Sequence, residues 1–144
     1  MTLGNKSQFD MIHVHLEKSE EAYKDAVLLF ESRKSFNGSA NRVYYAMFHA
    51  EKALLLTRGI LGDSHKHVHT QLSNQFVKEG QLPDNTGRDI RLVENIRYVA
   101  DYSGEKSVTK EEVEEALAKT KNFIEQVKEL LHTHSGLESP KEAP

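Results

Sequence analysis

The stretch from Ser39 to Gly59, SANRVYYAMFHAEKALLLTRG, carries the densest run of apolar residues in the chain and predicts its central helix. Ser39 is a suitable N-cap, because its hydroxyl can accept from a free backbone N–H. Gly59 suits the position just after the helix, because glycine tolerates left-handed backbone. Apolar side chains cover most of the helical circumference, so this helix is expected to pack against several neighbours at once.

A narrow polar stripe interrupts that apolar surface. Successive residues of a helix turn by about 100°, which brings five side chains into the stripe: Asn41, Arg42, Tyr45, His49 and Lys52. One interpretation is the solvated side of an amphipathic helix. The alternative is a recognition site, because an amide, a guanidinium, a phenol and an imidazole suit a phosphate or a carboxylate.

Composition narrows the classes of protein. The chain has 144 residues, enough for one helical domain, expected over residues 1–134, with a disordered tail at 135–144. It has no cysteine, which excludes disulfides, thiolate nucleophiles and Cys-based zinc sites. No apolar run is long enough to span a bilayer and no signal peptide is recognisable, so we expect a cytoplasmic protein without membrane contact. The net charge of −3 gives no overall attraction to nucleic acid.

Four more helices are expected around the central one. Apolar residues recur at three- and four-residue spacing over about 7–34, 64–79, 85–102 and 109–131. Asn37-Gly38 is typical of a tight turn between the first two helices, and Asp63-Ser64 of a loop and N-cap before the third. Thr109 opens a capping box for the last. No segment alternates as a strand does, so we predict an all-α, up-and-down bundle of four long helices plus a short extra helix.

Eight histidines raise the question of a metal site. Seven of them form three alternating sets, and the middle set, His65, His67 and His69, lies near a loop. Residues two apart on a helix point in different directions, and no run of carboxylates accompanies this set. We therefore expect polar histidines at helix ends, with His69 or Leu72 on the buried side of the third helix, and neither a metal nor another cofactor.

A second constellation lies in the fourth helix, where Arg97 falls at the edge of the apolar arc with Asp101 beside it. An ion pair within the helix is one explanation, because residues four apart are neighbours. The other is that Arg97 projects into a cleft or subunit interface and binds an anion. Both can hold at once, since a carboxylate can position an arginine for a ligand.

Two signatures resemble the small stand-alone prokaryotic branch of the HEPN domain family. They are Asn-Arg-x-Tyr-Tyr-Ala-x-Phe-His-Ala, from Asn41 to Ala50, and Arg-x-x-Ala-Asp-Tyr, from Arg97 to Tyr102. The resemblance extends over residues 9–131 and implies a helical bundle, usually a homodimer. Members are often encoded beside a minimal nucleotidyltransferase as a two-component, toxin-antitoxin-like module.

The same resemblance bears on activity. The family's ribonucleases carry an arginine, four to six further residues and then a histidine, but the corresponding positions here are Tyr102, Ser103 and Gly104. The leading hypothesis is therefore a bundle that acts by dimerisation and partner binding, leaning away from an enzyme. The first alternative is a metal-independent ribonuclease toxin that uses Arg97, His49 and Tyr102 with Arg42. The second is a nucleotide-binding sensor.

One geometric expectation connects the two signatures. If the central and fourth helices lie side by side, their polar residues share one groove that could bind an anion, a nucleotide or RNA. The ligand-binding candidates are Asn41, Arg42, Tyr45, His49, Arg97, Asp101 and Tyr102. We expect Arg42 or His49 within reach of the Arg97 to Tyr102 segment, with Asp101 accepting from Arg97 and from a second donor.

Overall fold

The computed structural model describes residues 5–62 and 64–133, and across them the backbone is helical with no strand. The elements are α1 (Asn5–Glu31), α2 (Phe36–Leu56), α3 (His65–Leu72), η1 (Ser73–Val77), α4 (Thr86–Tyr102) and α5 (Lys110–Thr133). The predicted all-α bundle of four long helices with a short extra helix is confirmed. The expected tail at 135–144 and Asp63 of the expected third-helix cap lie outside the described residues.

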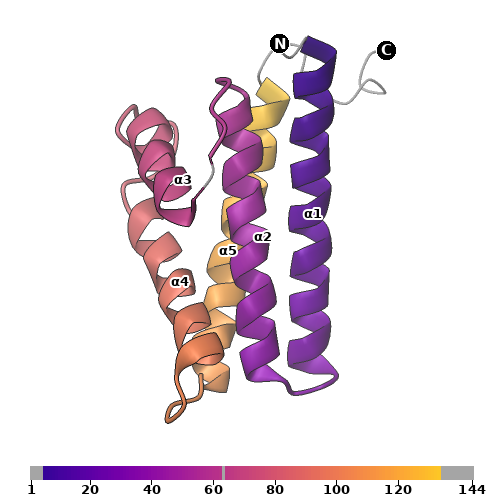
Figure 1. Ribbon diagram of the computed structural model, residues 1–144, viewed down its shortest axis with the longest axis vertical. Helices are drawn as coiled ribbons and strands as arrows, with labels where there is room; N and C mark the ends of the chain where they lie inside the picture. The colour runs from indigo at the N-terminus through magenta and orange to yellow at the C-terminus, as the bar shows by residue number, and fades with distance from the viewer. Residues whose placement is uncertain (1–4, 63, 134–144) are drawn as a thin grey trace.

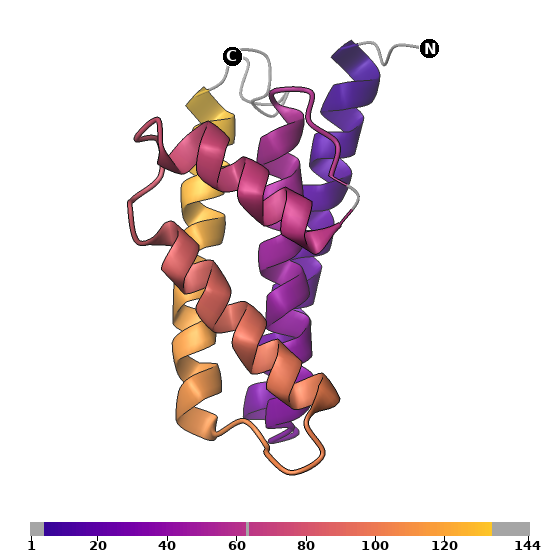
Figure 2. The same cartoon turned by 60° about the vertical axis from the view of Figure 1, so that its left-hand side comes forward.

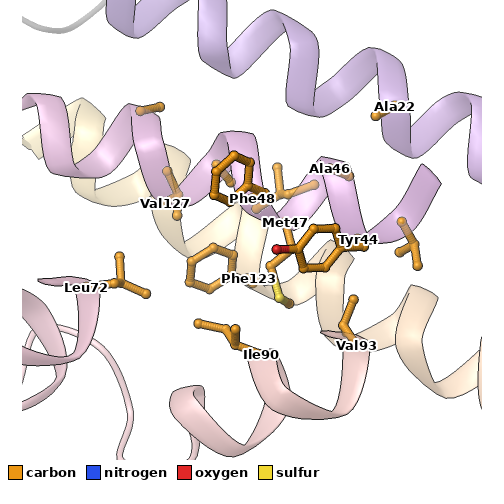
Figure 3. Packing of buried hydrophobic residues seen from close by; sticks show 14 of the residues in the cluster. Ala22, Tyr44, Ala46, Met47, Phe48, Leu72, Ile90, Val93, Phe123 and Val127 are labelled. Atoms are coloured by element: carbon orange, nitrogen blue, oxygen red, sulfur yellow. The ribbon is translucent and has the colours of Figure 1, made fainter. Parts of the chain in front are cut away.

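Helix α2 is the central element, as its apolar sequence predicts. It contacts α1, α3, α4 and α5, and it lies between α1 and the α3–α4 pair with α5 behind it (Figure 1). Seen from the side, α3 lies across the upper part of the bundle, above α4 (Figure 2). Tyr44 and Met47 of α2 meet Ile90 of α4 and Phe123 of α5 in the core (Figure 3). Burying this many apolar side chains is the main favourable term in folding.

The start of α2 differs from the prediction. The helix begins at Phe36, one turn before Ser39, with Ser35 as its N-cap residue. Ser39 is fully buried, and its hydroxyl donates to the carbonyl of Ala26 in α1 at 2.8 Å. The predicted N-cap is therefore wrong. The Ser39 hydroxyl hydrogen bonds to another helix, and a local sequence pattern does not reveal such a contact.

The turn between α1 and α2 is correspondingly earlier than Asn37-Gly38. Helix α1 ends at Glu31, and Lys34 takes the left-handed conformation, with φ of 54°. Asn37 lies in the first turn of α2, where its side-chain oxygen accepts from the backbone N–H of Val108 at 3.3 Å. The residue that was expected to form the turn instead ties the segment before α5 to α2.

The remaining helix ends follow the sequence more closely. Gly59 takes a positive φ of 72°, as the sequence predicted, and Gly80 likewise takes a positive φ of 82°. Thr109 and Glu112 exchange the two hydrogen bonds of a capping box, at 2.9 and 3.1 Å. The third helix differs: it is regular only to Leu72 and then widens into the single π turn η1. Arg58 of the preceding loop donates to the carbonyl of Gln75 in that turn at 2.6 Å.

Candidate functional site at the junction of α2, α3 and α4

The polar stripe of α2 divides between two sides of the helix. Arg42, Tyr45 and His49 turn toward α1 and line a hollow of about 310 Å³. The residues that α1 contributes to it are Lys18, Glu21, Ala22 and Asp25. The guanidinium of Arg42 lies 5.1 Å from the centre of the Tyr45 ring, within cation–π range. All three α2 side chains are half-buried, so this part of the stripe is only partly open to solvent.

His49 pairs with a histidine of α1 and not with Arg97. Its Nδ1 lies 3.0 Å from Nδ1 of His15, and the two rings are stacked. Burial, followed by the charges of His15 and the nearby cations Lys18, Lys52 and Arg42, lowers the pKa of His49 to about 4. His49 is therefore a neutral imidazole at pH 7, and it is not the imidazolium that a general acid would need.

On its other side, α2 meets the second signature through Asn41. The amide nitrogen of Asn41 donates to Asp101 at 3.0 Å, and Asp101 lies 3.6 Å from Arg97. Asn41 also accepts from Nε of Arg42 at 3.2 Å. Asp101 thus joins Arg97 to α2 as a shared acceptor. The direct donor is Asn41, whereas Arg42 reaches this group only through Asn41.

Arg97 lies between two aromatic rings. Its guanidinium carbon is 4.5 Å from the centre of the Tyr44 ring and 5.7 Å from that of Tyr102. It donates to the Tyr102 hydroxyl at 3.4 Å, while its buried Nε lacks a partner among the described residues. Its side chain is 12% exposed, which leaves one edge of a fixed cation at the surface. A guanidinium held in this way can bind a carboxylate or phosphate.

The structure adds a group that the sequence analysis missed. Glu51 of α2 is fully buried, and one of its oxygens lies 2.7 Å from Nδ1 of His69 in α3. Nε2 of His69 faces the Tyr44 hydroxyl at 3.4 Å and Glu94 of α4 at 3.6 Å. Tyr44 also hydrogen bonds to Nδ1 of His65. An unbroken series of polar contacts therefore leads from the core to His65, beside Arg97.

Two signals in the sequence could have indicated this group. Glu51 lies within the apolar arc of α2, where a carboxylate needs a buried partner. His65 and His69 are four apart in α3, so they share one face even though His67 between them does not. Ser64 fixes the start of that helix by accepting from the backbone N–H of His67 at 3.1 Å.

A cavity of about 510 Å³ opens beside His69, between α3, η1 and α4. His69 and Glu94 form part of its wall, together with the apolar side chains of Leu72 and Ile90. The cavity gives His69, the second member of the series, a route to solvent. In residues 5–62 and 64–133, no three His, Asp or Glu side chains converge closely enough to hold a metal ion.

Comparison with known proteins identifies the family. The HEPN domain model matches residues 12–130, so the chain belongs to the HEPN domain family. A protein of Methanocaldococcus jannaschii named "Putative toxin" is 36% identical over 129 residues, covering 90% of this chain and 95% of the relative. A second so named from the same organism is 32% identical, covering 81% and 78%. A UPF0332 protein of Thermotoga maritima is 27% identical, covering 79% and 86%. Among the described helices, none has the length and apolar character needed to cross a membrane.

Proposed function

We propose that this protein is the dimerising HEPN component of a two-component, toxin-antitoxin-like module, and that it binds a minimal nucleotidyltransferase. The observation that carries the proposal is the exposed aromatic pair of α4. Tyr98 and Tyr102 are 63% and 64% exposed, and their ring centres lie 5.2 Å apart. Arg97 and Asp101 lie directly beside them.

The chemistry of this surface suits a protein contact. Tyrosine and arginine are the residue types that most often dominate the binding energy of interfaces. Contiguous apolar surface is uncommon on monomers, and where it occurs it often marks an interaction site. Two relatives that carry the name "Putative toxin" support the module, because a toxin-antitoxin pair has two components.

Co-expression tests the proposal. The chain is produced with and without a tagged minimal nucleotidyltransferase, and the mass of each purified species is measured by light scattering. We expect a dimer for the chain alone and a complex that survives gel filtration when both proteins are present. A monomer that forms no complex at micromolar concentration contradicts the proposal.

A metal-independent ribonuclease is the second candidate, and one observation favours it. The sequence lacks a histidine after Arg97, and we propose that His65 of α3 serves in its place. Tyr44 contacts both residues, through its ring with Arg97 and through its hydroxyl with His65. Tyr44 contacts Nδ1 of His65, so Nε2 is the ring nitrogen that would act on a substrate.

The chemistry would be an internal transfer of the phosphodiester. Nε2 of His65 takes the proton of the 2′ hydroxyl, and the 2′ oxygen then attacks the phosphorus. Arg97 binds the non-bridging oxygens, where negative charge increases in the transition state. The bond to the 5′ oxygen breaks, and this oxygen takes a proton from water. The products are a 2′,3′-cyclic phosphate and a 5′ hydroxyl.

Cleavage of a labelled RNA in EDTA tests this second function. We expect the wild type to cut and both His65→Ala and Arg97→Ala to lose at least 100-fold in rate. His67→Ala serves as the control, because it removes an exposed histidine from the same helix. Intact RNA with the wild-type dimer contradicts the ribonuclease. Activity that survives His65→Ala but not His49→Ala would instead place the site between α1 and α2.

A further inference from the structure

The buried carboxylate of Glu51 requires an explanation that a packing role does not give. Transferring an ionised carboxylate out of water costs several kcal/mol even after relaxation. One Glu51 oxygen has no partner among the described residues, so the site is not optimised to hold the charge. Burial raises the pKa of Glu51, and the hydrogen bond from His69 offsets this only in part. Packing alone therefore does not account for a carboxylate at this position.

Glu51 is the inner end of a series of four side chains. His69 contacts Glu51 through Nδ1 and the Tyr44 hydroxyl through Nε2, at 2.7 and 3.4 Å. The same hydroxyl contacts Nδ1 of His65. Tyr44 has one hydroxyl proton, so it can donate to only one histidine at a time and must accept from the other. The direction of one hydrogen bond therefore determines the direction of the next.

The proton on Nε2 of His69 sets this direction. When Nε2 lacks a proton, it accepts from Tyr44, and Tyr44 in turn accepts from Nδ1–H of His65. The outer Nε2 of His65 is then a free base. When Nε2 of His69 carries a proton, Tyr44 donates to Nδ1 of His65, and the outer Nε2 of His65 carries the proton instead.

We propose that Glu51 and His69 are positioning residues that determine, through Tyr44, which ring nitrogen of His65 carries the proton. Loss of one proton from the buried pair converts the outer nitrogen of His65 from a donor to a base. The consequence for catalysis rests on the ribonuclease candidate proposed above, whereas the coupling between the four side chains does not.

The charged surroundings separate the titrations of the two histidines. As the pH falls, the Glu51–His69 pair gains its proton at a higher pH than His65 becomes a cation. The groups that face the two histidines are Tyr44, Glu51 and Lys52 of α2 and Glu94 and Arg97 of α4. Burial lowers the pKa of His69, but the hydrogen bond and charge of Glu51, with the charge of Glu94, outweigh it and raise the pKa overall. Burial and then Arg97 lower the pKa of His65. Burial also raises the pKa of Tyr44, which keeps its hydroxyl proton in place.

Nitrogen NMR of ¹⁵N-histidine-labelled protein tests the coupling, because the two ring nitrogens report the tautomer directly. In the wild type, we expect the tautomer of His65 to change with the same midpoint pH as the titration of His69. In Glu51→Gln, both midpoints should move together to lower pH, because the carboxylate that stabilises the His69 cation is gone. In Tyr44→Phe, His69 should still titrate while the tautomer of His65 no longer follows it.

Exposed His67 on the same helix is the internal control, and its signals should not change in any variant. Thermal melts check that each variant folds, and Tyr44→Phe keeps the buried ring. A His65 tautomer that is the same at every pH, or that still follows His69 in Tyr44→Phe, overturns the proposal. RNA cleavage by the same proteins is measured separately, so an inactive wild type with intact coupling refutes the ribonuclease and not the coupling.

Discussion

At the scale of single residues, Glu51 and His69 show how unequal the two halves of a buried pair are. The Glu51 side chain is fully enclosed, whereas the His69 side chain is 16% exposed. Removing His69 leaves the Glu51 carboxylate in the core without a partner, whereas removing Glu51 leaves an imidazole that water can reach. The cost of each change should therefore differ.

We expect His69→Leu to lower the free energy of unfolding by about 3–5 kcal/mol, because an unpaired buried charge remains. Glu51→Met should cost only about 1 kcal/mol, the net value of an ordinary hydrogen bond. The double variant should resemble Glu51→Met and not the sum of the two. Urea unfolding measures all three, and strictly additive losses would mean that the two side chains are not energetically coupled.

His49 predicts how stability depends on pH. Its pKa is about 4 in the folded protein and 6.5 in the unfolded chain, so below pH 6.5 protons bind the unfolded chain first. The contribution of His49 is complete above pH 6.5 and decreases as the pH falls toward 4. Unfolding measured between these values should therefore show falling stability, and His49→Gln should flatten the decline. His67→Gln, at an exposed position, should leave it unchanged.

Replacing Asp101 should cost less stability than breaking the buried Glu51–His69 pair, because Asp101 is close to solvent. Its side chain is 25% exposed, and its contacts with Asn41 and Arg97 are 3.0 and 3.6 Å long. We expect Asp101→Ala to cost about 1 kcal/mol or less, as for other surface pairs. Asp101→Asn retains an acceptor for Asn41 and should lose less. A cost of about 3 kcal/mol in urea unfolding would mean that the group is buried in solution, as a dimer would make it.

At the scale of helices, close contact between α1 and α2 depends on small residues. Ala22 and Ala26 of α1 are buried, and Ser19 donates to the carbonyl of Ala46 in α2 at 2.6 Å. We expect Ala26→Leu to cost about 1–3 kcal/mol, because extra methyl groups would force these helices apart. Leu28→Ala, on the exposed side of α1, should change stability by less than about 0.5 kcal/mol. Thermal unfolding compares the two, and equal effects would contradict this packing.

The same helices show how much of the fold could be predicted from the sequence. Periodicity located the helices, and local chemistry located ends such as Gly59 and the Thr109 capping box, because a cap is formed by residues close in the chain. The prediction from local sequence was wrong at Ser39 and at η1. There the contacts come from other parts of the chain: Ser39 hydrogen bonds to Ala26 of α1, and Arg58 hydrogen bonds to η1. Tertiary contacts override local preference at such positions.

The candidate site could likewise be predicted only in part. The sequence drew attention to Asn41, Arg97 and Asp101, because their residue types were unusual for their helical positions, and the structure brings these three together. It could not pair Glu51 with His69, since residues 18 apart meet only through the packing of α3 on α2. Ligand binding by any of these residues remains a prediction.

At the scale of the whole molecule, an interface on α4 would connect the surface to the buried group. Tyr102 contacts Arg97, Arg97 contacts Tyr44, and Tyr44 leads to His69 and Glu51. A second copy or a partner that covers Tyr102 would also exclude water from Arg97. Excluding water strengthens the electrostatic contacts of a guanidinium.

This surface gives the last prediction. If Tyr98 and Tyr102 lie at the centre of a dimer interface, replacing either with alanine should raise the dimer dissociation constant at least tenfold, about 1.4 kcal/mol. Val14→Ala, which shortens a side chain that is 45% exposed on α1, is the matched control and should leave the constant unchanged. Sedimentation equilibrium at several concentrations measures all three. If both tyrosine variants dimerise like the wild type, the interface lies elsewhere, and Arg97 keeps its solvent-facing edge in the assembly.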